Sequence, residues 1–288
     1  MAVAATTETG ARPARAGRRA TLPGWVGTVP FFAYVAVFLL WPTAIVVVDA
    51  LKNPAGGWAF GNIAKLGDPL VRGYFIGSFK LCLLSSVFGA VFGAILAYAV
   101  ASGNPDGLIR RLYIAVSGLL AQFGGVTLAF AFLVLIGPVG LLFHASWFYS
   151  FPWGITVIYT YFQIPLMVLV FLPAIDGVKA QWREASENLG ASAWQYWRYV
   201  GGPLLLPAFL GSALLLFANA LSAFATIQAW EDQIAYIVPQ QISTALSSEV
   251  GLNNVNVADL LALGMIILMA IVMTGYALLQ RRAARWLR

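Results

Sequence analysis

Long, continuous apolar stretches dominate this chain of 288 residues. An α-helix rises about 1.5 Å per residue, so about 20 apolar residues cross the roughly 30 Å hydrocarbon core of a bilayer. Only helices and closed barrels satisfy their backbone polar groups in lipid, and a barrel would require alternating rather than continuous hydrophobicity. The sequence therefore predicts an all-α, polytopic membrane protein with six spans, at about residues 28–50, 75–101, 112–136, 153–175, 204–228 and 257–280.

The composition agrees with a membrane environment. Hydrophobic residues make up 60% of the chain, charged residues make up 10%, and the mean hydropathy is +0.82. An ordinary soluble domain is about half apolar and a quarter charged. The single cysteine, Cys82, and the single histidine, His144, provide neither an internal disulfide nor a metal cluster. We therefore predict a protein without a metal site.

The distribution of Lys and Arg predicts the orientation. With the N-terminus in the cytoplasm, 13 of these residues fall on the cytoplasmic side and 4 on the outer side. By the positive-inside rule, both termini are then cytoplasmic. Residues 1–24, rich in Ala, Thr and Arg, are expected to be a disordered basic cytoplasmic tail ahead of the transmembrane domain, residues 25–288. The net charge of +6 follows from this topology and requires no nucleic acid.

Glycine and proline interrupt several spans. Trp41-Pro42 should kink the first helix or end its regular part, because proline lacks an amide donor. Gly89 and Gly93 have the small-xxx-small spacing of closely packed helices, either inside one bundle or at an interface with a partner subunit. Adjacent glycines at 124 and 125 weaken the third span, which favours close packing or a cavity equally.

A few polar residues lie within the spans. Asn219, Ser222, Thr226 and Gln228 are mostly three or four residues apart and would share one helix face, which would face other helices or a water-filled path. Gln163 precedes Pro165 by two residues, so its amide has either a structural role or a role in the pathway. The candidates for lining a pathway are Gln122, Gln163, Asn219, Ser222 and Gln228.

Three carboxylates are placed near the outer mouth of the predicted bundle. Glu231 and Asp232 lie in a polar outer segment, where solvent exposure is the simple alternative to a binding role. Asp259 opens the last span, where it would either cap the helix N-terminus or recognise a cation.

The loop between the fourth and fifth spans, residues 176–203, is polar and helix-forming. Gly190 is placed to end one short helix in a left-handed conformation, and Ser192 with Gln195 has the spacing of a capping box for a second. Trp194, Trp197 and Val200 would form an apolar stripe on that second helix. The loop either lies on the lipid headgroups or docks into a protein. The acidic Glu184 and Glu187 favour a protein, because the inner leaflet is negative.

The loop resembles the cytoplasmic signature loop of the inner-membrane permeases of ABC importers that depend on a binding protein. The resemblance is carried by Glu184-Ala185-Ser186, Gly190, Val200 and Gly202-Pro203 at the family's spacing. The chain departs from the usual pattern at Ser186 for Ala, Val200 for Ile and Gly202 for Leu. The loop also sits between the fourth and fifth of six spans, as in that family.

The resemblance implies a type I ABC importer permease in the bacterial plasma (inner) membrane. Its partners would be two cytoplasmic ATP-binding subunits, a second permease subunit, identical or homologous, and an extracytoplasmic substrate-binding protein. ATP and Mg would bind the partner ATPase and no cofactor would bind this chain. The positions implied to couple the loop to the ATPase are Glu184, Ala185, Ser186, Gly190, Ala191, Val200 and Pro203.

Within that family, Tyr161-Phe162-Gln163-Ile164-Pro165, the Trp-rich segment 194–199 and the tail Gln280-Arg281-Arg282 look most like the spermidine/putrescine branch. The expected function is therefore import of a small hydrophilic solute, with a polyamine as one candidate. The alternative is an ion-coupled secondary carrier or channel, although the spans lack the mid-membrane ionisable groups that such proteins use. No nucleotide-binding loop and no hydrolase motif occurs, so we expect a transport subunit and not an enzyme.

Overall fold

The computed structural model describes residues 28–52, 57–136, 140–142, 148, 151–229, 237–247 and 255–285. Within these ranges every regular element is a helix, and the one β-bridge pairs Lys52 with Trp58. The all-α prediction is confirmed. Among the described residues, five helices are long and apolar enough to cross a membrane, and a bent pair makes a sixth candidate span.

The chain divides into two compact units, Met1–Ile45 and Val46–Arg288. In the first unit, α1 (Val29–Val35) continues into a π-helical turn, Ala36–Leu40, where the amide of Trp41 donates to the carbonyl of Ala36. Helix α2 (Trp41–Ala50) starts in the first unit and ends in the second. The regular α-helix thus ends ahead of Pro42, as predicted, although the backbone stays helical to Ala50.

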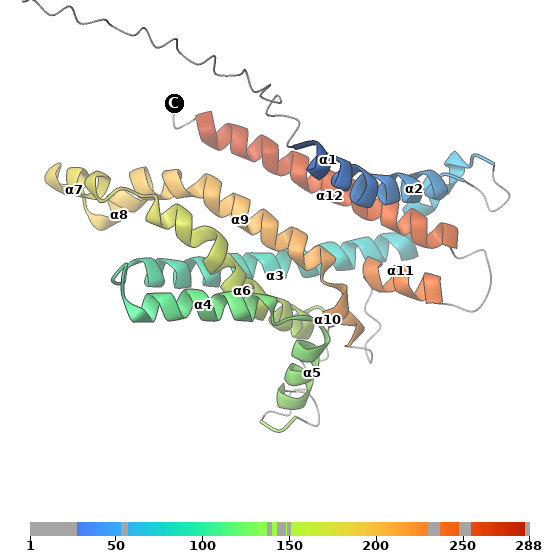
Figure 1. Cartoon of the computed structure of the whole chain (residues 1–288), viewed down its shortest axis with the longest axis horizontal. Coiled ribbons are helices and arrows are strands. Elements are labelled where there is room, and N and C mark those ends of the chain that lie inside the picture. The colour runs from blue at the N-terminus through green and yellow to red at the C-terminus, as the bar shows by residue number, and fades with distance from the viewer. Residues whose placement is uncertain are drawn as a thin grey trace, which may run out of the picture. The chain divides into compact units, whose positions relative to one another are not determined.

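The second unit is built on α3 (Pro69–Ala101), which packs along α6 (Trp153–Asp176) and α9 (Gly202–Ser222). Figure 1 shows these three helices side by side, with α12 (Val255–Arg285) beyond α9. Gly89 and Gly93 of α3 are buried against α6: a Cβ at Gly93 would lie 2.4 Å from the Cβ of Met167. The packing interpretation of the glycine pair is therefore correct for this bundle.

The third predicted span, 112–136, is not one continuous helix. It consists of α4 (Leu108–Gln122) and α5 (Gly125–Ile136), which are bent by 96° with respect to each other. Phe123 leaves the helical region, and Gly125 has a φ of +75°. Only glycine adopts this conformation at little cost, so the Gly-Gly pair breaks the helix rather than merely weakening it. In Figure 1, α5 turns away from α4.

The fifth predicted span, 204–228, also differs from expectation. A continuous helical path begins in the preceding loop with α8 (Ala193–Tyr196), passes through a π-helical turn, Trp197–Gly201, and continues as α9 to Ser222. The chain then breaks at Ala223 before the short α10 (Phe224–Gln228). Thr226 and Gln228 therefore do not share a helix face with Asn219 and Ser222, and this part of the prediction is wrong.

The connections that precede α3 and α12 contain short helices. Residues 51–74 include a 3₁₀-helix, Phe60–Gly67, and the start of α3, for which the Asp68 carboxylate accepts a hydrogen bond from the amide of Leu70 at 2.9 Å. The segment before the last span includes α11 (Val238–Ser247), which packs against α12.

Candidate functional site

The loop between α6 and α9 begins with α7 (Ala180–Asn188), which ends at Gly190 in a left-handed conformation with a φ of +77°. The amide of Ala191 donates to the carbonyl of Ser186 at 3.0 Å, and the amide of Gly190 donates to the carbonyl of Glu187 at 2.9 Å. This pair of bonds is the Schellman arrangement, which satisfies the last carbonyls of a helix. The predicted helix end is confirmed.

The second helix starts immediately after this bend. The Ser192 amide donates to Oε1 of Gln195 at 2.7 Å, and the Gln195 amide donates to Oγ of Ser192 at 3.3 Å. Both bonds of the predicted capping box are therefore present. We call residues 180–201 the elbow. Figure 1 shows α7 and α8 at one end of α6 and α9, and the helical path from α8 into α9 has no break that would let the elbow move separately.

One of the two acidic residues of α7, Glu187, is neutralised by an ion pair within the elbow. Nε of Arg183 lies 2.9 Å from Oε1 of Glu187, one turn away on α7, and both side chains are exposed. The hydrogen bond from Arg183 to Glu187 raises the pKa of the guanidinium. Glu184 is exposed and forms no ion pair among the described residues. It is thus the carboxylate of the elbow that is available to a partner.

The elbow also exposes large apolar side chains. Leu189 is 88% exposed and Trp194 is 76% exposed, although the loop as a whole is polar. The predicted stripe of Trp194, Trp197 and Val200 is only partly present. The ring of Trp197 packs edge-on against Tyr98 of α3, with centroids 5.3 Å apart, and Val200 is half-buried. The π-helical turn causes the difference, because its wider turn shifts the side chains out of three-residue register.

The remaining positions of the signature lie around the same bend. Ala185 is exposed on α7, Ala191 is half-buried after the bend, and Pro203 is half-buried in the first turn of α9. A Cβ at Gly202 would lie 2.4 Å from the carbonyl oxygen of Trp197, so the π-helical turn depends on the absence of a side chain there. The elbow is therefore a rigid unit attached directly to α9.

The candidate pathway residues occupy different environments. Gln122 is exposed at the end of α4, Asn219 and Gln228 are half-buried, and Ser222 is exposed with its hydroxyl donating to the carbonyl of Asn219 at 3.0 Å. Gln163 is completely buried, and its Nε2 donates to Oγ of Ser85 on α3 at 3.2 Å. The structural alternative for Gln163 is favoured, because its amide lies between two packed helices.

The two helix breaks are joined by hydrogen bonds from residues far apart in the sequence. The amide of Gly125 donates to Oγ1 of Thr226 at 3.1 Å, and the hydroxyl of Tyr159 donates to the carbonyl of Ala223. Helices α5 and α10 pack together at this place. The sequence places Thr226 on a polar helix face, but it does not indicate that Thr226 or Tyr159 bonds the backbone at a break in another helix, because nothing local marks such a contact.

The outer-mouth candidates are only partly described. Glu231 and Asp232 lie outside the described residues. Asp259 is half-buried in α12, and the like charge of Asp49 on α2 repels its carboxylate. Helix α12 begins at Val255 and its first turn holds no acidic residue, so Asp259 does not cap it. Among the described residues, no group of three or more His, Cys, Asp or Glu side chains is placed to hold a metal ion.

Comparisons with known proteins agree with the polytopic architecture. The model of the family described as "Binding-protein-dependent transport system inner membrane component" matches residues 89–288. The sulfate transport system permease protein CysT of Escherichia coli K12 is 28% identical over 225 residues, which cover 73% of this chain and 76% of that protein. The molybdenum transport system permease protein ModB of E. coli K12 is 28% identical over 51% of this chain and 66% of its own length.

A third relative is the thiamine transport system permease protein ThiP of Salmonella typhimurium, which is 24% identical over 73% of this chain and 39% of its own length. Among solved structures, a bacterial ABC transporter that imports the acidic polysaccharide alginate aligns with a TM-score of 0.71 at 16% identity, over 90% of this chain and 94% of that one. The inward-facing MetNI methionine transporter aligns with a TM-score of 0.57 at 18% identity, over 74% and 95%. The fold is that of these transporter subunits.

Proposed function

Since this chain belongs to the family of binding-protein-dependent transport system inner membrane components, we propose that it is a permease subunit whose elbow receives the movement of a separate ATP-binding subunit. The observation that carries the proposal is the combination of rigidity and exposure in the elbow. Two hydrogen-bonded caps fix its shape, and exposed side chains, including Glu184, Leu189 and Trp194, cover its surface. Apolar groups exposed beside a free carboxylate suit a protein groove better than water.

The mechanism follows from the direct connection of the elbow to α9. When ATP binding closes the ATP-binding subunits, their displacement would pass from the elbow through the π-helical turn into α9, and through α9 to α3 and α6. Rigid elements that move as bodies are the usual means of such switching. The ion pair Arg110–Asp176 also joins α4 to the end of α6, next to the elbow. The spans attached to the elbow would thereby alternate between inward-open and outward-open arrangements.

The proposed partners are two ATP-binding subunits, which bind ATP and Mg, a second permease subunit and an extracytoplasmic binding protein. Support comes from the related alginate transporter, whose structure was solved in complex with a periplasmic protein bound to an alginate pentasaccharide. The proposed orientation places both termini and the elbow in the cytoplasm, on the distribution of Lys and Arg.

We propose a small hydrophilic solute as the substrate, with an oxyanion as the first candidate and a polyamine as the second. Two of the relatives are named for sulfate and molybdenum transport. A polyamine is best held by carboxylates, and those in the described spans are Asp49, Asp176 and Asp259, of which Asp49 is paired with Lys52 and Asp176 with Arg110. The uncharged amides of Gln122 and Asn219 suit an anion at least as well.

Reconstitution tests the proposal. The full-length chain, a candidate second permease and candidate ATP-binding subunits are placed in proteoliposomes, and ATP hydrolysis is measured with a panel of binding proteins loaded with sulfate, molybdate, thiamine or spermidine. We expect stimulation by one loaded binding protein and no uptake without ATP. Uptake driven by an ion gradient in the absence of the ATP-binding subunits would instead establish a secondary carrier.

A further inference from the structure

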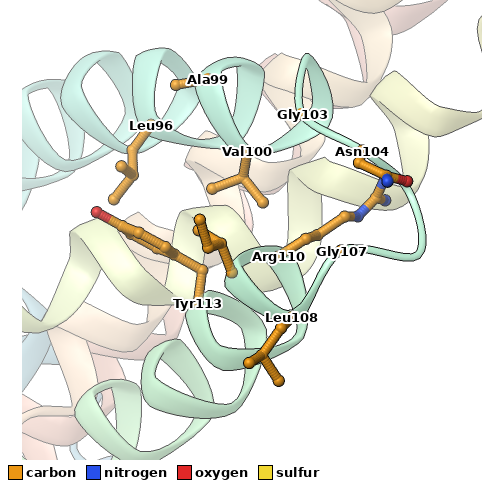
Figure 2. A pocket seen from close by; sticks show the side chains of 10 residues that line it. Leu96, Ala99, Val100, Gly103, Asn104, Gly107, Leu108, Arg110 and Tyr113 are labelled. Atoms are coloured by element: carbon orange, nitrogen blue, oxygen red, sulfur yellow. The ribbon is translucent and has the colours of Figure 1, made fainter.

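A cavity of about 460 Å³ lies between the last turns of α3 and the first turns of α4. This volume is within the range of ligand pockets, roughly 300–1,000 Å³. Figure 2 shows Leu96, Val100 and Tyr113 inside it, while Asn104 and Arg110 lie together near the turn that joins the helices. The other lining residues are Ala99, Gly103, Gly107, Leu108 and Ile109. The cavity thus combines apolar walls with one polar, cationic end.

The polar end is electropositive for two reasons. Helix α4 follows Gly107, which offers no side chain to its first amides, and its first turn contains no acidic residue. These amides carry the partial positive charge of a helix N-terminus, and Arg111 adds a full charge in the same turn, while Arg110 shares its charge with Asp176. Of the two arginines, Arg110 lines the cavity and Arg111 is exposed. The charge at this end therefore suits an anionic group.

The nearby carboxylates leave hydrogen-bond donors of Arg110 available to an anion. Arg110 pairs with Asp176 of α6, and its side chain is only 13% exposed. A guanidinium has five N–H donors, so a pair with one carboxylate leaves donors for a second acceptor. Asp106 lies in the adjoining turn and offsets part of the local charge, but it is exposed and does not line the cavity.

The apolar walls indicate what kind of anion fits. Leu108 and Ile109 are 82% and 76% exposed, so the cavity is continuous with an apolar outer face of α4. In a membrane protein, a hydrocarbon chain can enter such a slot from the side, whereas a free phosphate or sulfate would make no use of the walls. An anionic amphiphile satisfies both the walls and the charged end, and the bilayer supplies one.

We propose that this cavity binds an anionic phospholipid, with an acyl chain between α3 and α4 and the phosphate at Arg110. The site is independent of the function proposed for the elbow. It does adjoin the elbow, because Asp176, the other partner of Arg110, is the last residue of α6 before the connection to α7.

The test uses the full-length protein in nanodiscs that contain a trace of phosphatidylglycerol or phosphatidylcholine with a photoactivatable diazirine at mid-chain. After irradiation, labelled peptides are identified by mass spectrometry. We expect phosphatidylglycerol to label residues 96–113, and phosphatidylcholine to label them about fivefold less, as one basic contact predicts. Equal labelling by the two lipids, or cross-linking of this segment to a second protein chain in place of lipid, would overturn the proposal.

Two test variants, Ala99→Phe and Arg110→Gln, probe the apolar walls and the charged end separately, and each has its own control variant. Ala99→Phe fills the cavity without touching the ion pair, and should reduce labelling at least to the phosphatidylcholine value. Val91→Phe adds the same ring at an exposed position of α3 outside the cavity, and should label as the unmodified protein does. Arg110→Gln should abolish the preference for phosphatidylglycerol, and Arg110→Lys should retain most of it. Undiminished labelling in Ala99→Phe would refute the site even if Arg110→Gln fails to fold.

Discussion

The hydroxyl oxygen of Thr226 accepts a hydrogen bond from the amide of Gly125 at 3.1 Å, across 101 positions of sequence. Each of these residues follows a helix break, at Phe123–Gly124 and at Ala223. The carbonyl of Ala223 in turn accepts the hydroxyl hydrogen of Tyr159. Broken backbone at membrane depth is tolerated only where protein or water satisfies its polar groups. Here side chains of neighbouring helices satisfy them, so the two breaks depend on the same packing.

Thr226→Val should destabilise the contact between the two helix breaks. Thr226 is 1% exposed, and valine keeps its shape but leaves the amide of Gly125 without an acceptor, at a cost of about 1–3 kcal/mol. A lower melting temperature in detergent measures the effect. Thr274→Val is the matched control, because the exposed Thr274 donates its hydroxyl to the carbonyl of Ala270 in its own helix. An equal fall in melting temperature in both variants would mean that the hydrogen bond between Gly125 and Thr226 adds no specific stability.

Gly93→Ala should separate α3 from α6. The added Cβ would lie 2.4 Å from the Cβ of Met167 and 2.8 Å from the carbonyl oxygen of Ile164, and backbone cannot move aside as a flexible side chain can. Overpacking of this kind costs about 1–3 kcal/mol. Gly73→Ala, in the same helix with no atom within 4 Å, should be neutral or stabilising. Thermal unfolding of the two purified variants distinguishes them, and unchanged stability of Gly93→Ala would contradict the close approach.

Much of the fold could be predicted because its determinants are local. Apolar runs of sufficient length fix the spans, and the end of α7 and the start of α8 follow from Gly190 and Ser192 acting on residues within one turn. The Schellman bonds and the capping box were therefore predictable.

The rest could not be predicted because it depends on contacts between distant residues. The Gly124-Gly125 pair signals weakness but not a 96° bend, which exists because Thr226 and the packing of α10 hold α5 in place. The π-helical turn after Tyr196 likewise reflects the contact of Trp197 with Tyr98 of α3 and the close approach at Gly202. A three-residue stripe drawn on an ideal helix could not include either effect.

Gly190→Val should uncouple the elbow from the ATP-binding subunit. A β-branched residue at a φ of +77° is strained by about 1–3 kcal/mol, although no neighbouring atom lies within 4 Å of the place that its Cβ would take. We expect normal membrane insertion with loss of most ATPase stimulation in the reconstituted complex. Gly190→Asn should preserve it, since asparagine tolerates the left-handed region. Full stimulation in the valine variant would count against the role of the elbow.

The orientation can be tested with single cysteines in a Cys82→Ser background, because Cys82 is buried in α3. The positive-inside count predicts that Asn188→Cys in α7 is protected in intact cells, whereas Lys65→Cys in the 3₁₀-helix reacts with a membrane-impermeant maleimide. Both positions are exposed in the structure. Labelling of Asn188→Cys before permeabilisation would place the elbow outside and exclude a cytoplasmic ATPase as its partner.

Substitutions of Gln163 can show whether its side chain serves helix packing or the transport pathway. Its Nε2 donates to Ser85, but among the described residues its Oε1 has no hydrogen-bond partner. Gln163→Met keeps the volume beside Gly89 and removes the unpaired oxygen, so stability should change by less than about 1.5 kcal/mol. Gln163→Ala leaves a void between α3 and α6 and should cost about 2–5 kcal/mol. Uptake by the methionine variant decides the role: packing predicts activity near that of the unmodified protein, and a stable but inactive variant would return Gln163 to the pathway.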